Sequence, residues 1–481
     1  MQIDRRQFLK AVGAGAVLAT AGRGPAADAG ASTKPNIVLC MADDQGWGDM
    51  GYYGHKVLKT PNFDAMAAAG LRFDLFYAAC PVCTPTRGSV MTGRHPNRFG
   101  CFKWGHALRP QEITVAEALK TAGYVTGHFG KWHLGSVYKN SPVNPGASGF
   151  DEWLSAANFY DNDAVLSREG TAVQAKGESS MIAADAAIAF IRKHAKGPRP
   201  FLAVVWFGSP HSPHQAVEAD RKLYADQPKR KQHFLGEITG MDRAFGKIRK
   251  ELGTLGIREN TILWYCSDNG GLPGLSVTGG RKNKGSIYEG GLRVPGILEW
   301  PARIPSPRKT SVPCNTSDIY PTLLEIVGVR MKGQPPLDGV SLVGLIGGKM
   351  TARPRPMGFW DYPARGIGQR STAMLQALMK LQAQGKEATD PALLRPNAGK
   401  ITKQYPENAF PGHAAWLDWP WKLHRIAGKG RPRFELYNLA EDPGEKSNVA
   451  ATQADRLKAM TAALEAWLAS VVRSLNGKDY T

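Results

Sequence analysis

The sequence is poor in cysteine and contains no long apolar run, and each absence excludes a class of protein. Six cysteines in 481 residues are too few for a disulfide-built scaffold, although an oxidising compartment would allow one or two bridges. Beyond the first thirty residues, no stretch approaches the roughly 18 consecutive apolar residues of a membrane-spanning helix. We therefore expect a protein without stable membrane insertion.

A nucleic-acid-binding motif is also missing, although the chain is strongly basic. Lys and Arg number 61 against 41 Asp and Glu, which gives a formal net charge of +20. The excess is spread along the chain without a long basic run, so we expect no nucleic-acid partner. The excess of positive charge is explained by solvated surface residues. It would also be explained by attraction of an anionic substrate, if a site for one exists.

Residues 1–31 resemble a twin-arginine signal peptide. Arg5 and Arg6 precede Phe8 and Leu9, and a modest apolar run of small residues follows. The alternative is an ordinary amphipathic helix. The resemblance predicts export to the periplasm or the extracellular space.

Four short apolar runs have strand character, and each stops at a group of polar residues. The runs cover residues 36–41, 124–128, 201–207 and 261–266. Helical patterns lie between them, one of them with a capping-box signal at Thr114 and Glu117. Alternating strands and helices predict an α/β fold with a largely parallel sheet, whose ligands bind at the carboxyl ends of the strands.

The pattern changes towards the C-terminus. We expect a catalytic domain over residues 34–348 and a smaller α+β domain over residues 349–481. The second contains two alternating segments that predict an antiparallel hairpin, residues 421–426 and 433–439, and ends in an amphipathic helix.

The first and last of the four strand ends carry an oxygen-rich cluster. Asp43, Asp44, Asp268 and Asn269 offer only oxygen ligands, and three carboxylates at one edge would repel each other without a cation. Such ligands suit Ca²⁺ or Mg²⁺. A turn or a helix cap explains either pair taken alone, but two pairs at equivalent strand ends favour a metal.

The segment of residues 79–94, ACPVCTPTRGSVMTGR, indicates an anion site. Pro85 predicts the first turn of a helix that ends near Gly93, with Cys83 at its N-terminus. Free N–H groups there favour an anion, and Arg87 adds a fork that grips a tetrahedral oxyanion. Cys80 and Cys83 leave thiol–disulfide exchange open as an alternative.

CTPTR at Cys83 and GYVTGHFGKWHLG from Gly123 resemble the two signatures of the formylglycine-dependent sulfatases. ADDQGWGD, SPH at His211, SDNGG and KGSIYEGGLRVP follow in the order of the family. The likeness is strongest to the arylsulfatase A and N-acetylgalactosamine-6-sulfatase branch. It implies an alkaline-phosphatase-like α/β/α sandwich.

The resemblance also implies roles for individual residues. A separate maturation enzyme would convert Cys83 to formylglycine, which acts beside one Ca²⁺ ion. The implied metal ligands are Asp43, Asp44, Asp268 and Asn269, and the implied catalytic residues are Cys83, Arg87, Lys131, His133, His211 and Lys284. We further expect His214 and Arg281 to bind substrate, and we place His106 as a residue that either lines the substrate pocket or belongs to a polar loop.

The expected activity is hydrolysis of sulfate monoesters, with sulfated carbohydrates as the favoured substrates. A phosphoester or phosphonate hydrolase on the same scaffold is the nearest alternative, and a non-catalytic glycan-binding relative is another.

Overall fold

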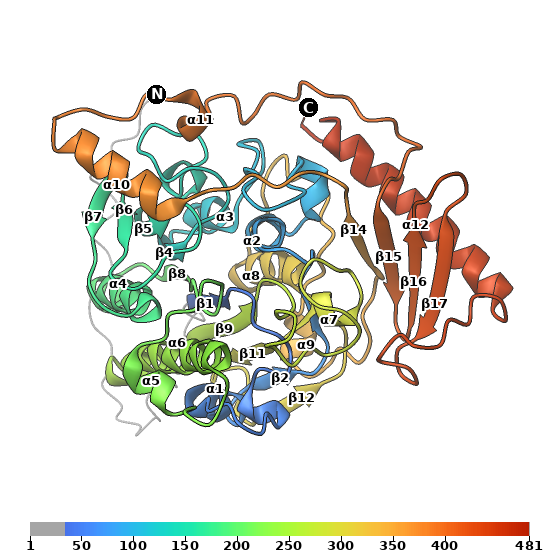
Figure 1. Ribbon diagram of the computed structural model, residues 1–481, viewed down its shortest axis with the longest axis horizontal. Coiled ribbons are helices and arrows are strands. Elements are labelled where there is room, and N and C mark those ends of the chain that lie inside the picture. The colour runs from blue at the N-terminus through green and yellow to red at the C-terminus, as the bar shows by residue number, and fades with distance from the viewer. Residues whose placement is uncertain (1–33, 481) are drawn as a thin grey trace, which may run out of the picture. The chain divides into compact units, whose positions relative to one another are not determined.

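The computed structural model describes residues 34–480, so the predicted signal peptide lies outside the described residues. Its main feature is a ten-stranded sheet (Figure 1). The strands follow one another in the order β12 (Arg308–Thr310), β2 (Leu71–Phe73), β11 (Gly296–Glu299), β9 (Thr261–Ser267), β1 (Asn36–Ala42), β8 (Phe201–Trp206), β4 (Val125–Lys131), β5 (Glu152–Ala156), β6 (Val165–Arg168) and β7 (Thr171–Gln174).

The centre of this sheet is parallel. β9, β1, β8, β4 and β5 pair in parallel, whereas β11 runs antiparallel to β9 and the outer strands β6 and β7 form antiparallel pairs. The four predicted strands are β1, β4, β8 and β9, and they lie side by side. The predicted parallel α/β sheet is confirmed.

Helices cover both faces of the sheet because alternate side chains of each strand point in opposite directions. Ile37, Leu39 and Met41 of β1 pack on one side with α2 (Cys83–Thr92), α3 (Val115–Thr121) and α8 (Ile319–Val327). Val38 and Cys40 pack on the other side with α1 (Pro61–Ala67), α4 (Ser179–His194) and α6 (Lys229–Thr254). The predicted capping box begins α3.

The C-terminal part contains a separate antiparallel sheet of β14 (Met357–Asp361), β15 (His413–Asp418), β16 (Trp421–Ile426) and β17 (Arg433–Asn438). One face packs against α12 (Ala454–Leu475) through residues such as Leu423 and Leu464. The other face packs through Phe359 and Leu417 against Tyr77 and Ile287, which precede residue 349 in the chain. The predicted hairpin and terminal helix are thus present, but the domain boundary at residue 349 stays a prediction.

Shorter elements connect these layers. A small sheet consists of β10 (Arg293–Val294), β3 (Phe76–Tyr77) and β13 (Cys314–Asn315). Short helices are α5 (Glu218–Lys222), α7 (Glu289–Leu292), α9 (Val343–Ile346) and α11 (Pro391–Leu394), with 3₁₀ turns at η1 (Gly51–Tyr53), η2 (Pro96–Phe99), η3 (Gly146–Ser148) and η4 (Thr316–Asp318). The helix α10 (Ser371–Gln382) lies between β14 and β15 in the chain, but it packs against β6 and β7 of the large sheet.

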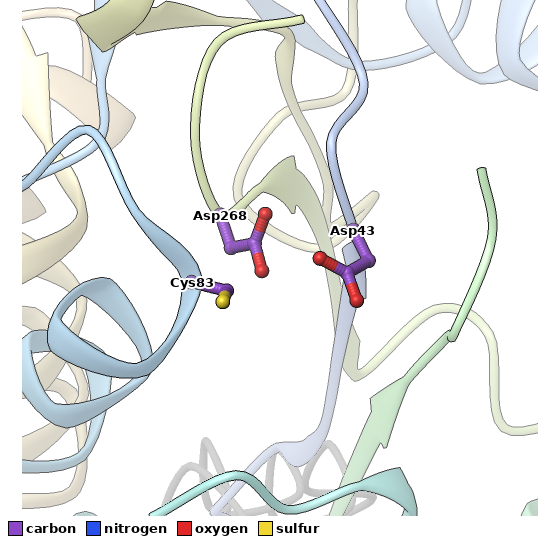
Figure 2. A group of neighbouring side chains, drawn as sticks. All are labelled: Asp43, Cys83 and Asp268. Carbon is purple, nitrogen blue, oxygen red and sulfur yellow. The ribbon is translucent and has the colours of Figure 1, made fainter. Parts of the chain in front are cut away.

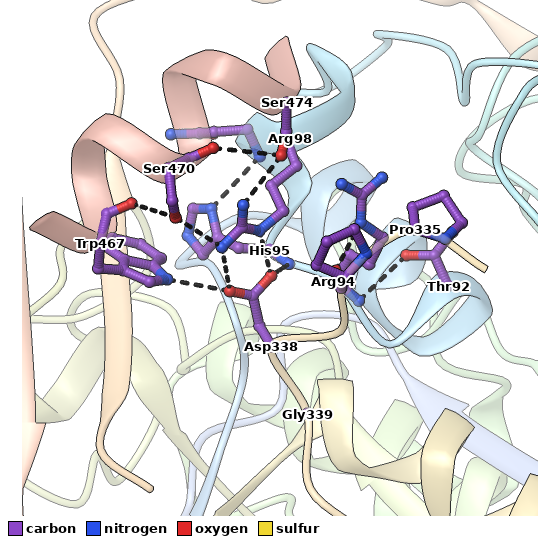
Figure 3. A network of polar contacts seen from close by, with 12 residues as sticks. Thr92, Arg94, His95, Arg98, Pro335, Asp338, Gly339, Trp467, Ser470 and Ser474 are labelled. Carbon is purple, nitrogen blue, oxygen red and sulfur yellow. Dashed lines mark hydrogen bonds and ion pairs between the residues drawn. The ribbon is translucent and has the colours of Figure 1, made fainter. Parts of the chain in front are cut away.

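A polar network fastens α12 to η2 (Figure 3). Asp338 accepts two hydrogen bonds from the Arg98 guanidinium, at 2.6 and 2.8 Å, and one from the indole N–H of Trp467 at 2.9 Å. Arg98 also donates to the Ser474 hydroxyl of α12. A charge-assisted pair with this many partners fixes the helix against the catalytic part.

None of the helices in residues 34–480 combines the length and the apolar character that crossing a lipid bilayer requires.

Candidate active site

Four neighbouring parallel strands bring polar residues to one edge of the central sheet. β1 is followed by Asp43, β9 by Asp268, and the loop after β8 contains His211, while Lys131 is the last residue of β4. These residues come from distant parts of the chain. They meet because all four strands point the same way.

Cys83 faces this edge from the first turn of α2. It is the first residue of the helix and only 2 % exposed, and Gly93 in the left-handed conformation ends the helix as predicted. The Cys83 Sγ and one carboxylate oxygen each of Asp43 and Asp268 lie within 4.8 Å of one another. Figure 2 shows the three side chains pointing towards a common centre.

Three basic side chains pair with the carboxylates of the cluster. The Arg87 Nη2 donates to Asp268 Oδ2 at 2.7 Å and lies 3.8 Å from Asp43 Oδ2. The Lys131 Nζ donates to Asp43. The Lys284 Nζ lies 2.6 Å from Asp44 Oδ1. Cationic side chains of three different segments thus surround Cys83.

The pKa values of the carboxylates diverge because the groups are buried and crowded. Burial raises the pKa of Asp268 to about 7, and the negative charge of Asp43 adds to the rise. Burial acts on Asp43 too, but Lys131 and His211 outweigh it and hold its pKa below the ordinary value. Carboxylates so close together cannot all ionise cheaply without additional positive charge.

Two buried oxygens at the cluster have no hydrogen-bond donor among the residues that the structure describes. Asp43 Oδ1 and Asn269 Oδ1 are both without a partner, and the Asn269 Nδ2 donates to Asp44 Oδ1 at 2.8 Å. Unsatisfied buried acceptors are rare because they cost free energy. A hard cation accepts such oxygens as ligands. The residues therefore fit a divalent metal ion.

Two histidines stand beside the cluster. His133 has a positive φ of 55°, and neither ring nitrogen has a hydrogen-bond partner within residues 34–480. Burial lowers its pKa well below the ordinary value, and Lys131 and Arg87 lower it further. The His211 Nε2 lies 3.7 Å from Asp44 Oδ2. Burial also lowers the pKa of His211. Neutral imidazoles of this kind can accept a proton.

His214 and Arg281 have contacts outside this cluster. The His214 Nδ1 is 3.2 Å from Glu237 Oε2 of α6, and its side chain is buried. The Arg281 guanidinium lies 4.2 Å from the centre of the Tyr288 ring and donates to the Tyr437 hydroxyl. Their predicted substrate contacts stay predictions.

Sequence reasoning missed Trp206, the last residue of β8. The Arg87 guanidinium lies 5.1 Å from the centre of its ring, close enough for a cation–π contact. Trp206 ends an apolar strand and is fully buried, so its pattern indicates only core packing. Its position directly before the loop with His211 is the one signal in the sequence.

Comparison with known proteins agrees with this geometry. The family model described as Sulfatase matches residues 35–329, which is more than half of the chain. N-acetylgalactosamine-6-sulfatase of Canis lupus familiaris is 34 % identical over 382 residues, covering 70 % of each chain. Arylsulfatase A of Homo sapiens is 29 % identical over 467 residues, covering 88 % of this chain and 85 % of its own.

A solved structure extends the likeness to the whole fold. The crystal structure of Ps i-CgsB in complex with k-i-k-neocarrahexaose superposes with a TM-score of 0.75 at 24 % identity, covering 91 % of this chain and 93 % of that one. The predicted alkaline-phosphatase-like sandwich with a smaller antiparallel part is confirmed. Signatures, fold and family model agree: the chain belongs to the sulfatase family, the formylglycine-dependent sulfuric ester hydrolases.

Proposed function

We propose that this sulfatase hydrolyses sulfate monoesters of carbohydrates, with Cys83 converted to formylglycine and one Ca²⁺ ion bound by Asp43, Asp44, Asp268 and Asn269. The observation that carries the proposal is the position of Cys83 at a helix N-terminus, beside buried carboxylates and within reach of three cations.

Conversion of Cys83 explains an otherwise unsuitable nucleophile. Burial raises the pKa of the Cys83 thiol, so little thiolate forms near neutral pH. A hydrated formylglycine supplies a hydroxyl group for attack at sulfur and a second one for release of the sulfate. Burial also raises the pKa of Cys80, which argues against thiol–disulfide exchange through this pair.

The metal would supply charge where the substrate is anionic. Three carboxylates and three basic side chains balance one another in the described site. A bound Ca²⁺ would give the site a net positive charge and stabilise negative charge that develops on the sulfate oxygens. Oxygen-only ligands favour calcium or magnesium over transition metals, and the family resemblance favours calcium.

The side chains around Cys83 divide the remaining work. Arg87 positions residue 83 and its neighbouring carboxylates, and Lys131 and Lys284 bind the sulfate oxygens. His211 or Lys284 donates a proton to the departing alcohol, while His133 takes up a proton from residue 83 through a ring nitrogen that has no other partner. His214 and Arg281 keep a proposed role in binding the sugar.

A carbohydrate substrate is supported by the relatives and by the charge of the chain. The name of one relative, N-acetylgalactosamine-6-sulfatase, specifies a sulfated amino sugar, and the solved structure of Ps i-CgsB holds k-i-k-neocarrahexaose. A net charge of +20 attracts polyanionic glycans over a distance of about one Debye length, roughly 10 Å at 0.1 M salt.

Export through the twin-arginine route completes the proposal. Cys83 is nearly inaccessible in the folded protein. The maturation enzyme must therefore reach it before folding ends, which places conversion in the cytoplasm and export of the folded protein afterwards. Arg5 and Arg6 would direct that export.

The direct test compares an aryl sulfate with an aryl phosphate at equal concentration, using protein co-expressed with a formylglycine-generating enzyme. We expect much faster release of sulfate and a mass change at residue 83. Cys83→Ala should reduce turnover by at least about 10³-fold, the scale of losing a catalytic nucleophile. Cys80→Ala serves as the matched control and should keep most activity.

The rival functions predict different results. Faster release of phosphate would identify a phosphoester hydrolase on the same scaffold. Residue 83 that remains a thiol beside the maturation enzyme, together with glycan binding but no turnover, would identify a non-catalytic relative.

A further inference from the structure

A cavity lies outside the cluster around Cys83. It measures about 270 Å³, opens to the surface, and is lined by the loop after η2, a loop that follows α11, and the end of α12 at Leu475. Its size is close to the lower limit of the roughly 300–1,000 Å³ typical of small-molecule sites. His106, a residue of the chain's polar loops, lies in its wall.

The lining of this cavity is basic and contains no acidic residue. Arg109, Arg395, Lys400 and Lys403 contribute the charge, and Phe102 is one of its aromatic side chains. Among residues 34–480, none of the four cations forms an ion pair within 4.0 Å of a carboxylate. Lys400 and Lys403 are exposed, whereas Arg109 and Arg395 are partly buried, so the missing ion pair is informative for the two arginines.

Arg109 is the clearest case of a cavity cation without a carboxylate partner. Its Nη2 donates to the Leu475 carbonyl at 2.8 Å, and the guanidinium lies 5.8 Å from the centre of the Tyr480 ring, but its buried Nη1 has no hydrogen-bond partner in the described part of the chain. Glu112 interacts electrostatically with Arg109, but it already accepts hydrogen bonds from Arg94 and from the Tyr480 hydroxyl. A buried donor without an acceptor indicates a place for an anion.

The loop with Arg395 supports the same conclusion. Arg395 has a positive φ of 54°, in the left-handed region that a side chain of its size rarely adopts. Burial lowers its pKa, because no carboxylate compensates the desolvation of the guanidinium. Backbone strain and an uncompensated charge at the same residue are typical of a binding site.

The cavity wall is connected to the helix that begins with Cys83. The Gly105 N–H donates to the Thr84 hydroxyl at 3.0 Å, and Thr84 follows Cys83 in α2. Ile367 N–H donates to the Trp104 carbonyl at 2.8 Å, so a segment of the C-terminal part covers the same loop. Arg395, Lys400 and Lys403 lie beyond residues 35–329, the range that matches the family model.

We propose that this cavity binds a second anionic group, a sulfate or a carboxylate, of the same glycan whose sulfate ester is cleaved at residue 83. The inference rests on the proposed function. The planar guanidinium groups of Arg395 and Arg109 can each donate two parallel hydrogen bonds to either oxyanion. The aromatic side chains offer apolar surface to a sugar ring. Oligosaccharides with two or more anionic groups are then preferred over a monosaccharide sulfate.

The test measures binding without turnover, in Cys83→Ala protein, by isothermal titration calorimetry. The probes are a chondroitin 6-sulfate tetrasaccharide and N-acetylgalactosamine 6-sulfate. Arg395→Gln combined with Lys400→Gln should weaken tetrasaccharide binding at least tenfold and leave the monosaccharide affinity within twofold. The matched control combines Arg330→Gln with Lys349→Gln, two exposed residues away from the cavity, and should change neither affinity.

Unchanged tetrasaccharide affinity in the cavity variant would overturn the inference, as would an equal loss for the monosaccharide. Lys403→Gln, at an exposed position, provides a second variant if the first one does not fold. A tetrasaccharide stripped of sulfate tests the carboxylate: if it binds the parent protein and loses this binding in the cavity variant, the group bound in the cavity is a carboxylate.

The same experiment separates this inference from the proposed function. Binding through the cavity with no sulfate released by the mature enzyme would refute the function alone. Sulfate release with unaltered binding in the cavity variant would refute the inference alone.

Discussion

The carboxylate of Asp338 connects the region of η2 with α12. It accepts hydrogen bonds from Arg98, from the His95 N–H and from Trp467. Burial opposes its ionisation, but Arg98 holds the pKa of Asp338 well below the ordinary value. A carboxylate with a lowered pKa stabilises the fold above the unfolded-state pKa, and the contribution is lost as the pH falls.

Asp338→Asn should therefore lower the free energy of unfolding by about 3 kcal/mol at pH 7, because it leaves Arg98 without its charge partner. The difference from the parent protein should persist from pH 8 to pH 5 and shrink below about pH 4, near the unfolded-state pKa of Asp. Urea denaturation at each pH measures it. Asp455→Asn, at an exposed position of α12, is the control, and an equal effect of both changes would contradict the role of Asp338.

Individual site residues could be predicted where a polar group follows an apolar strand. Asp43 and Asp268 could be found because their strands are recognisable and parallel strands bring their ends together. Trp206 could not, because an aromatic residue at the end of an apolar strand is indistinguishable from core. Lys422 was missed for the opposite reason, since a lysine in an alternating strand is normally solvated.

At the scale of elements, β16 is an inner strand of the small sheet that also holds a segment of the active site. Lys422 is fully buried, with its Nζ 2.8 Å from Glu289 Oε1 and 3.1 Å from Glu445 Oε1. Glu289 begins α7, directly after the segment that contains Lys284, and its N–H donates to Glu445 Oε2 at 2.7 Å. The small sheet therefore fixes the segment that delivers Lys284 to Asp44.

Lys422→Met should lower the free energy of unfolding by about 3–5 kcal/mol, because it leaves two buried carboxylates without their cation. It should also lower kcat/KM for an aryl sulfate as the Lys284 segment loosens. Denaturant titration and steady-state kinetics check both effects. Lys429→Met, at an exposed position of the same hairpin, should change neither, and a silent Lys422→Met would refute the coupling.

For the whole molecule, calcium should act as a stabilising ligand. At a free concentration one hundred times the dissociation constant, a ligand that binds only the folded state adds about 2.7 kcal/mol to the free energy of unfolding. We expect the Tm of chelator-treated protein to rise by a few degrees when Ca²⁺ is added, and by less with Mg²⁺. Differential scanning fluorimetry measures the shift.

Asn269→Ala should largely remove this shift, because it deletes one of the buried oxygens that lack a donor. An unchanged calcium response in that variant would place the ion elsewhere. A response equally strong with Mg²⁺ would favour magnesium as the bound metal.

The path of the chain between β14 and β15 couples the two sheets. These strands pair directly, yet about fifty residues separate them, and that excursion places α10 against β6 and β7. The Gln382 side chain accepts from the Ala172 N–H and donates to the Gly170 carbonyl, both at 2.9 Å. If the small sheet detached, the segment between β14 and β15 would be drawn away from β6 and β7, at the edge of the ten-stranded sheet. Cooperativity of unfolding is thus built into the connectivity, and partly folded chains that retain an assembled catalytic centre should be scarce at equilibrium.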